Sequence, residues 1–230
     1  MPDPTDARDQ GIRPLTVEEA ARRRRPRPRF DPSRPLAPAL LERLLETAAH
    51  APSPYELQPW RFLVVRDAAD RRRLQGCARN DPEVGRAAAV VVVLGYHQPE
   101  RTDLEPLLAR RVASGGCTAE QAAAIRGRAR SVLRDVAGRE LWATRAAMLA
   151  AATLVLAAGS LGVDAALVDD FDAEAVRREF GVPDDHAVCG LVALGYAEVE
   201  AEGPSPCLAG SRLGLDESAF AGHFGRPWAP

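Results

Sequence analysis

Apolar positions recur along the chain with two periods that alternate from segment to segment. Leucines and alanines at helical spacing predict an amphipathic helix that ends near His50. Short apolar runs over 61–65, 87–95, 165–168 and 188–196 predict strands. The run over 87–95 is unbroken, which is typical of a strand covered on both faces. Helices that alternate with strands predict a layered α+β or α/β domain.

The longest predicted helix covers 140–159 and is apolar on nearly every face. Such a helix must be buried, often in a subunit interface. Its most apolar run, Ala146 to Leu161, is too short to span a bilayer comfortably. Two shorter helices are predicted over 71–77 and 173–180, and the second is stopped by a Gly-Val-Pro sequence.

The first residues, 1–14, carry too little apolar character to pack, so we expect a disordered tail. Thr16 is then the predicted N-cap of a short helix. Six arginines follow within 22–29 and require an anion or water. A phosphate on a small cofactor suits them better than nucleic acid, because the run is short, lacks aromatic residues and lies in an acidic protein. A solvated charge run remains the alternative for many of them.

Two further segments complete the predicted organisation. The stretch 99–137 is helical, charged and interrupted by glycines, and we expect a surface excursion between two core elements. The stretch 198–230 is rich in proline and glycine, and we expect an arm that lies over another part of the molecule. The composition does not support two independent cores, so we predict one domain over 15–230.

Composition and charge exclude several classes of function. A net charge of −2 gives no overall attraction to nucleic acid. All 30 basic residues are arginine, which excludes lysine-based catalysis. The four cysteines form no CxxC pair, so we expect reduced structural thiols and no metal site. No secretory signal is visible, and we therefore expect a cytoplasmic protein without a nucleic-acid or membrane partner.

A rigid loop lies between the first predicted core helix and the first strand. Three prolines within 52–59 fix the backbone and favour a single shape. A shaped loop at such a junction is a common place to hold a ligand. An ordinary connection with a buried Trp60 accounts equally well for the pattern.

Four motifs follow one another along the chain. They are Arg-x-x-x-Arg-Phe-Asp-Pro over 25–32, Ala-Pro-Ser-x-x-x-x-Gln-Pro-Trp-x-Phe-x-Val-Val over 51–65, Ala-x-x-Leu-Gly-Val-Asp within 157–164, and Phe-Asp-x-Glu-x-Val-Arg-x-x-Phe-Gly-Val-Pro over 171–183. In this order they resemble the FMN-dependent nitroreductase superfamily, and the resemblance spans about 20–215. The resemblance implies an α+β fold, with a central, mostly antiparallel sheet flanked by helices. It also implies an intertwined homodimer, two FMN sites between the subunits and C-terminal arms that wrap the partner.

The same resemblance implies the chemistry and the site. Two electrons pass from NAD(P)H to FMN and then, by a ping-pong route, to a small nitroaromatic, quinone or similar substrate. No catalytic side chain is assigned, because flavin N5 carries the hydride. The excursion over 99–137 and Tyr55 would roof the substrate pocket. The positions carried over to cofactor binding are Arg24, Arg25, Pro52, Ser53, Glu56, Asn80, Val168, Asp169 and Arg212.

Several positions depart from the pattern of the resembled family. Glu56 and Glu83 stand where asparagine and lysine are common, and Pro26, Pro28 and Gly210 replace two basic residues and a serine. Two alternatives follow. The chain uses reduced flavin as a substrate or oxidises a peptide-derived intermediate, or it is a non-catalytic flavin- or ligand-binding dimer.

Three of the residues singled out also have a purely structural interpretation. Trp60 suits the core better than a stacking role, and Asn80 suits a turn before Asp81. Asp169, together with the next aspartate, could cap the helix that follows.

Overall fold

The computed structural model describes residues 14–24, 29–133, 136–198 and 212–228. Contacts divide the chain into a main unit, Met1–Ala197, and a C-terminal unit, Glu198–Pro230. Each unit is described by itself. The expected tail over 1–14 lies, except for its last residue, outside the described residues, as does Arg25.

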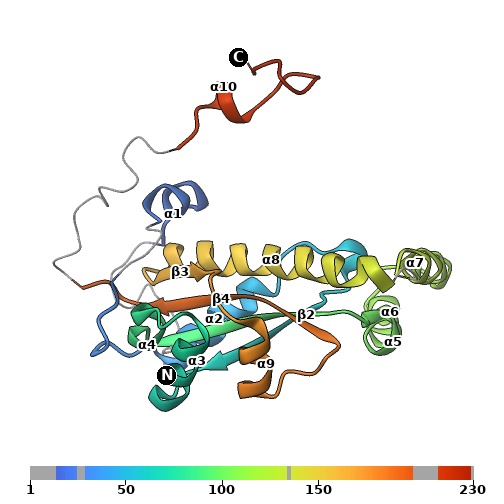
Figure 1. The fold of residues 1–230 in the computed structure, drawn as a ribbon. Helices are drawn as coiled ribbons and strands as arrows, with labels where there is room; N and C mark the ends of the chain where they lie inside the picture. The colour runs from blue at the N-terminus through green and yellow to red at the C-terminus, as the bar shows by residue number, and fades with distance from the viewer. Residues whose placement is uncertain (1–13, 25–28, 134–135, 199–211, 229–230) are drawn as a thin grey trace, which may run out of the picture. The chain divides into compact units, whose positions relative to one another are not determined.

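The centre of the main unit is a four-stranded antiparallel sheet in the order β1-β2-β4-β3 (Figure 1). Its strands are β1 (Trp60–Val65), β2 (Ala89–Tyr96), β3 (Asp164–Val168) and β4 (His186–Gly195). All three strand pairs are antiparallel, and the β2–β4 register shifts between Val93 and Leu94. The antiparallel α+β fold expected from the sequence is therefore confirmed.

Helices cover both faces of this sheet. On one face α2 (Pro38–Ala48) and α8 (Val136–Ser160) pack against alternate strand residues such as Val91 and Val93. On the other face α3 (Ala68–Cys77), α4 (Pro82–Arg86) and α9 (Ala173–Phe180) pack against Val90 and Val92. Every residue of β2 is buried, as its unbroken apolar run predicts.

Helix α8 is 25 residues long and crosses one whole face of the sheet. Its segment Gly138–Ser160, longer than the apolar run over 146–161 considered in the sequence, is long and apolar enough to span a membrane by length and composition alone. Core helices have the same properties. Alanines on the inner face allow close packing, and at Gly95 of β2 an added Cβ would lie only 3.1 Å from the backbone of Ala143. Packing on the sheet accounts for much of the apolar character.

Local sequence signals explain where several helices begin. Thr16 caps α1 (Val17–Arg23) with a full capping box, as predicted. Helix α3 begins earlier than predicted because the Asp67 carboxylate accepts hydrogen bonds from the amides of Ala69 and Asp70. The helix α9 is capped by Asp172, so the alternative cap by Asp169 and its neighbour was wrong.

The expected helical excursion consists of α5 (Pro99–Thr102), α6 (Leu104–Ala113) and α7 (Ala119–Val132). These helices form a small core of their own, which includes Leu104, Leu108 and Leu133. Leu57, from the Pro-rich loop before β1, is buried in that core with 1% of its surface exposed. The excursion therefore packs directly on this loop.

The C-terminal unit contains a short helix, α10 (Leu215–Ser218), and a tight turn. Phe220 pairs with Pro227 in an isolated β-bridge, and the rings of Phe220 and Phe224 are 4.5 Å apart. Phe224 and Trp228 remain 92% and 50% exposed. The predicted role of this segment as an arm over a partner stays a prediction.

Candidate functional site

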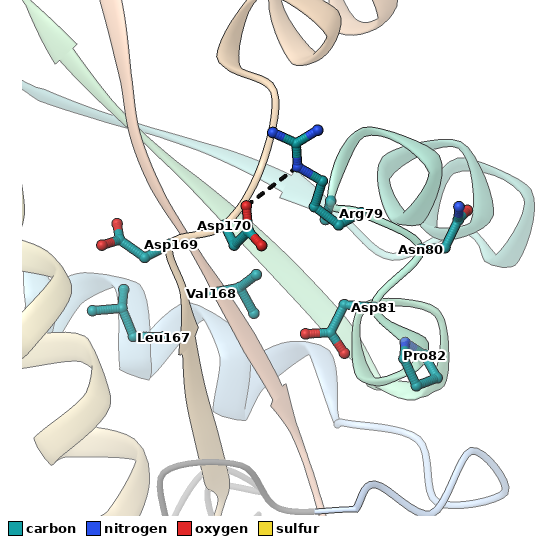
Figure 2. Close-up of a pocket in the computed structure, with 9 residues that line it drawn as sticks. Arg79, Asn80, Asp81, Pro82, Leu167, Val168, Asp169 and Asp170 are labelled. Carbon is teal, nitrogen blue, oxygen red and sulfur yellow. Dashed lines mark hydrogen bonds and ion pairs between the residues drawn. The ribbon is translucent and has the colours of Figure 1, made fainter.

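A polar pocket of about 460 Å³ opens where β3 ends beside the α3–α4 turn (Figure 2). The antiparallel sheet brings the end of β3 to the side on which α3 and α4 pack, so two segments about 90 positions apart meet there. The residues that line this pocket, named here the β3 pocket, are Ala78, Arg79, Asn80, Asp81, Pro82, Leu167, Val168, Asp169 and Asp170.

The turn on one side of the β3 pocket has a strained backbone. Arg79 and Asn80 both have left-handed conformations, with φ values of 51° and 59°. Non-glycine residues adopt this region rarely, and the strain persists only where the surroundings enforce it. Here the amide of Asn80 donates to the Gln75 carbonyl, and the Gln75 side chain donates back to the Asn80 carbonyl. The side chain of Asn80 points away from Asp169 (Figure 2).

Carboxylates dominate the charge of the β3 pocket. Asp81, Asp169 and Asp170 line it, and Arg79 is its one lining cation. The Arg79 guanidinium lies 3.3 Å from the Asp170 carboxylate, and both side chains are exposed, by 70% and 83%. An ion pair this exposed contributes little to folding stability, about 0–1 kcal/mol. The pair instead bridges the two sides of the pocket.

A second, apolar pocket of about 360 Å³ adjoins the first one through Leu167. Its wall is formed by residues of α8, and Arg24, at the end of α1, supplies its one charged group. The residues that line this pocket, named here the α8 pocket, are Arg24, Met148, Ala151, Ala152, Val155, Leu156 and Leu167. A flat apolar wall with a nearby cation suits a planar ring that carries an anionic group.

The predicted site residues separate into two groups in the main unit. Arg24, Asn80, Val168 and Asp169 line the two adjoining pockets. Residues Pro52, Ser53 and Glu56 line neither of them. Arg25 lies outside the described residues, and Arg212 lies in the C-terminal unit.

The Pro-rich loop is held in a strained conformation of its own. Tyr55, Glu56 and Gln58 have φ values of 56°, 55° and 48°. The Ser53 hydroxyl, 8% exposed, accepts a hydrogen bond from the Gln58 amide at 3.0 Å. Arg111 of the excursion donates to the Glu56 carbonyl at 3.4 Å. In addition to the three prolines on which the prediction rested, contacts with the Ser53 hydroxyl and with the excursion therefore shape the loop.

Trp60 and Glu83 have structural roles. Trp60 is 5% exposed and belongs to the core cluster under α2 and α8, which supports the core interpretation. The Glu83 carboxylate accepts a hydrogen bond from the Phe30 amide at 2.7 Å and lines neither pocket. A glutamate at this position therefore anchors the segment before α2.

Thiol chemistry is not available beside these pockets. Burial raises the pKa of the Cys77 thiol, which lies just before the β3-pocket turn, and nearby Glu179 and Asp172 raise it further. The thiol is therefore protonated at neutral pH and is a poor nucleophile. Cys77, Cys117 and Cys189 are free, and the described residues contain no group of three potential metal ligands.

Sequence reasoning missed the apolar half of the site. Met148 and Val155 pack against the core and also line the α8 pocket, so periodicity could not separate core from pocket. Arg79 was missed because an arginine gives no local sign of a left-handed backbone.

Comparisons with known proteins identify the family to which this fold belongs. The family model "Nitroreductase family" matches residues 20–196. The chain belongs to the nitroreductase family. A Thermus thermophilus protein named NADH dehydrogenase is 34% identical over 81% of this chain and 89% of its own length. An oxygen-insensitive NAD(P)H nitroreductase of Salmonella typhimurium is 25% identical over 74% and 84%.

A solved structure links the nitroreductase fold to a cofactor. The crystal structure of an Exiguobacterium sibiricum protein, described as a nitroreductase in complex with FMN, superimposes with a TM-score of 0.78. It is 25% identical, and the match covers 89% of this chain and 96% of the other.

Proposed function

We propose that this nitroreductase-family chain is an FMN-dependent oxidoreductase that takes electrons from NAD(P)H. The observation that carries the proposal is the junction of the two pockets at Leu167, where an apolar wall, a guanidinium and a polar rim adjoin. FMN combines a flat tricyclic ring with a phosphate and a polar pyrimidine edge. The donor set therefore fits the cofactor named for the Exiguobacterium structure.

The resemblance and the pocket geometry together suggest which residues hold the cofactor. Arg24 is positioned to bind the phosphate, since a guanidinium matches phosphate with paired hydrogen bonds. Asn80 would contact the ring after its side chain turns inward. The backbone at Val168 and Asp169 would face the reactive edge of the ring. FMN, when bound, supplies the two-electron chemistry by which a hydride from NAD(P)H reduces a nitroaromatic, quinone or similar acceptor.

The carboxylates of the β3 pocket affect which charge state of the cofactor can be bound. Asp169 and Asp170 place negative charge beside the ring site, where negative charge disfavours an anionic reduced ring. Arg79 opposes part of that charge through its pair with Asp170. We infer that this chain holds FMN less tightly than relatives with basic residues at this edge.

A second copy of the chain would complete the site. Pro52, Ser53 and Glu56 belong to a loop held in one shape, yet they line neither pocket of their own chain. The resemblance assigns this loop to the partner's cofactor. Leu141 and Leu149 on the outer side of α8 are 53% and 46% exposed, which supports an interface along that helix.

The excursion is the proposed source of substrate specificity. Its core contains Leu57 and packs against Tyr55, and Arg61 of β1 lies 2.6 Å from Asp103 at its start. If the Pro-rich loop closes the site, a substrate bound there therefore contacts residues of α5–α7.

A matched pair of variants, one in α1 and one at the residue after it, tests this proposal. Purified protein saturated with FMN should be yellow, bleach with NADH or NADPH, and give parallel double-reciprocal plots with a quinone. Arg24→Gln should raise the Kd for FMN about tenfold or more through loss of a charge-assisted contact. The control Arg22→Gln removes an exposed pair with Glu18 and should leave the Kd unchanged.

Three results separate the alternatives. Failure to bind FMN in either redox state contradicts the proposal. Binding of reduced FMN alone favours its use as a substrate. Binding of both states without turnover by either nicotinamide favours a non-catalytic flavin-binding dimer.

A further inference from the structure

A third cleft, of about 420 Å³, has none of the residues assigned to FMN in its lining. It is formed by the proline-rich turn before α2, the junction of β1 with α3, and the residue before β2. The residues that line it, named here the arginine cleft, are Pro32, Arg34, Pro35, Leu36, Arg66, Asp67, Arg71 and Ala88. It shares no lining residue with the β3 pocket or the α8 pocket.

Each arginine of this cleft is positioned by an uncharged group, although the charge of Asp31 acts on Arg34 and that of Asp67 acts on Arg71. Arg66 donates to the Leu36 carbonyl at 3.3 Å. Arg71 donates to the Gly85 carbonyl at 3.4 Å and to the Arg66 carbonyl. Arg34 lies over the Tyr196 ring, 4.1 Å from its centroid. Carbonyls and rings orient a guanidinium without neutralising it.

No ion pair joins any of these three arginines to a carboxylate within the described part of the chain. Some other arginines of the main unit are paired. Arg73, two positions after Arg71 in α3, lies within 2.8 Å of both Asp70 and Glu179, and Arg126 lies 2.8 Å from Glu105. The arginine cleft thus gathers three arginines without an ion pair in one concave site.

The one lining carboxylate is already engaged. Asp67 accepts hydrogen bonds from the Ala69 and Asp70 amides, which lowers its pKa and fixes it at the start of α3. Three guanidinium groups against one carboxylate leave a net charge of about +2 around the cleft. Partial burial lowers the pKa of Arg71, and the neighbouring Arg72 adds to this, while Asp67 offsets only part of the effect, so an anion would relieve an existing cost.

We propose that the arginine cleft binds a phosphate-bearing small molecule, with Arg34 and Arg66 as its recognition residues. Each guanidinium has five donors in a planar fork and uses few of them on the protein. Phosphate oxygens accept such paired donors. Pro32 and Pro35 fix the backbone of the turn, so the site is largely formed before binding.

The test uses full-length protein saturated with FMN, so that any flavin phosphate site is already filled. Pyrophosphate and ADP are titrated at constant ionic strength and followed by calorimetry and by the melting temperature. Both should bind saturably. Arg34→Gln with Arg66→Gln should raise each Kd about tenfold or more. Arg34→Gln alone should give a smaller increase and is the second variant, because Arg34 contacts only a ring.

Arg72→Gln is the matched control. It removes one positive charge from α3, the helix that carries Arg71, but does not line the cleft, and it should raise both Kd values much less than the double variant does. Equal affinity for pyrophosphate and ADP means that the cleft recognises the phosphates alone. At least tenfold tighter binding of ADP means that the ligand is a nucleotide. Absence of saturable binding, or an unchanged Kd in the double variant, overturns the proposal. A double variant that loses dimer mass in sedimentation also overturns it, because the cleft would then hold a segment of a second copy.

Discussion

At the scale of single residues, backbone strain is concentrated where the site is proposed. Within the described chain, the non-glycine residues with positive φ are Tyr55, Glu56, Gln58, Arg79 and Asn80. All of them lie in the Pro-rich loop or in the α3–α4 turn. A left-handed residue costs roughly 1–2 kcal/mol relative to the right-handed helix. Neither loop has a glycine to relieve that cost, so the two conformations are held by surrounding contacts such as those of Ser53 and Gln75.

Paired glycine substitutions in and beside α3 measure this strain. Arg79→Gly should leave the free energy of unfolding unchanged or raise it by up to about 1 kcal/mol, because glycine adopts φ near 51° without a steric penalty. Arg72→Gly, inside α3, should lower it by about 1 kcal/mol, as glycine does in a helix interior. Urea denaturation gives both values. Equal destabilisation by the two substitutions would show that the turn is not strained.

At the scale of elements, the sequence predicted the sheet and the long helices well because their apolar periods are regular. Helix α4 was not predicted, since its five residues hold a single buried apolar side chain, Val84. The site was predicted less completely. Asn80 and Asp169 could be placed through the resemblance. The α8 pocket and the burial of Leu57 in the core of the excursion, however, depend on contacts between distant segments. Such contacts leave no periodic signal in one sequence.

The packing of the excursion on the Pro-rich loop can be tested at Leu57. Leu57→Ala should destabilise the small core of the excursion by about 2–5 kcal/mol, because it leaves a cavity around a side chain that is 1% exposed. Amide hydrogen exchange over 104–133 should accelerate while exchange in β2 stays slow. Val112→Ala is the control on α6, with a side chain 39% exposed and an expected cost below about 0.5 kcal/mol. Uniform acceleration across the main unit would mean that the excursion is not a separate cooperative segment.

At the scale of the whole molecule, the residues of the proposed site lie in two separate regions of the main unit. The two adjoining pockets lie along α8 and the end of β3, and the Pro-rich loop is fixed by the excursion instead. Because the Pro-rich loop is held by its own Ser53 hydroxyl and by the excursion, it is not positioned to move over the pockets of its own chain. A loop that is pre-shaped but lines no pocket of its own chain suits a second copy, as the resemblance implies.

Assembly and cofactor binding should therefore be lost together. Leu149, on the outer side of α8, is 46% exposed and lines neither pocket, so a change there does not touch the cofactor directly. Leu149→Glu should bury a carboxylate in the proposed interface, reduce the mass in sedimentation to that of one 24.7 kDa chain and weaken FMN binding at least tenfold. Val112→Glu, on α6, should change neither. A monomeric Leu149→Glu protein that binds FMN as tightly as the wild type would mean that the cofactor site is complete within one chain. A Leu149→Glu protein that stays dimeric would mean that the interface does not lie on α8.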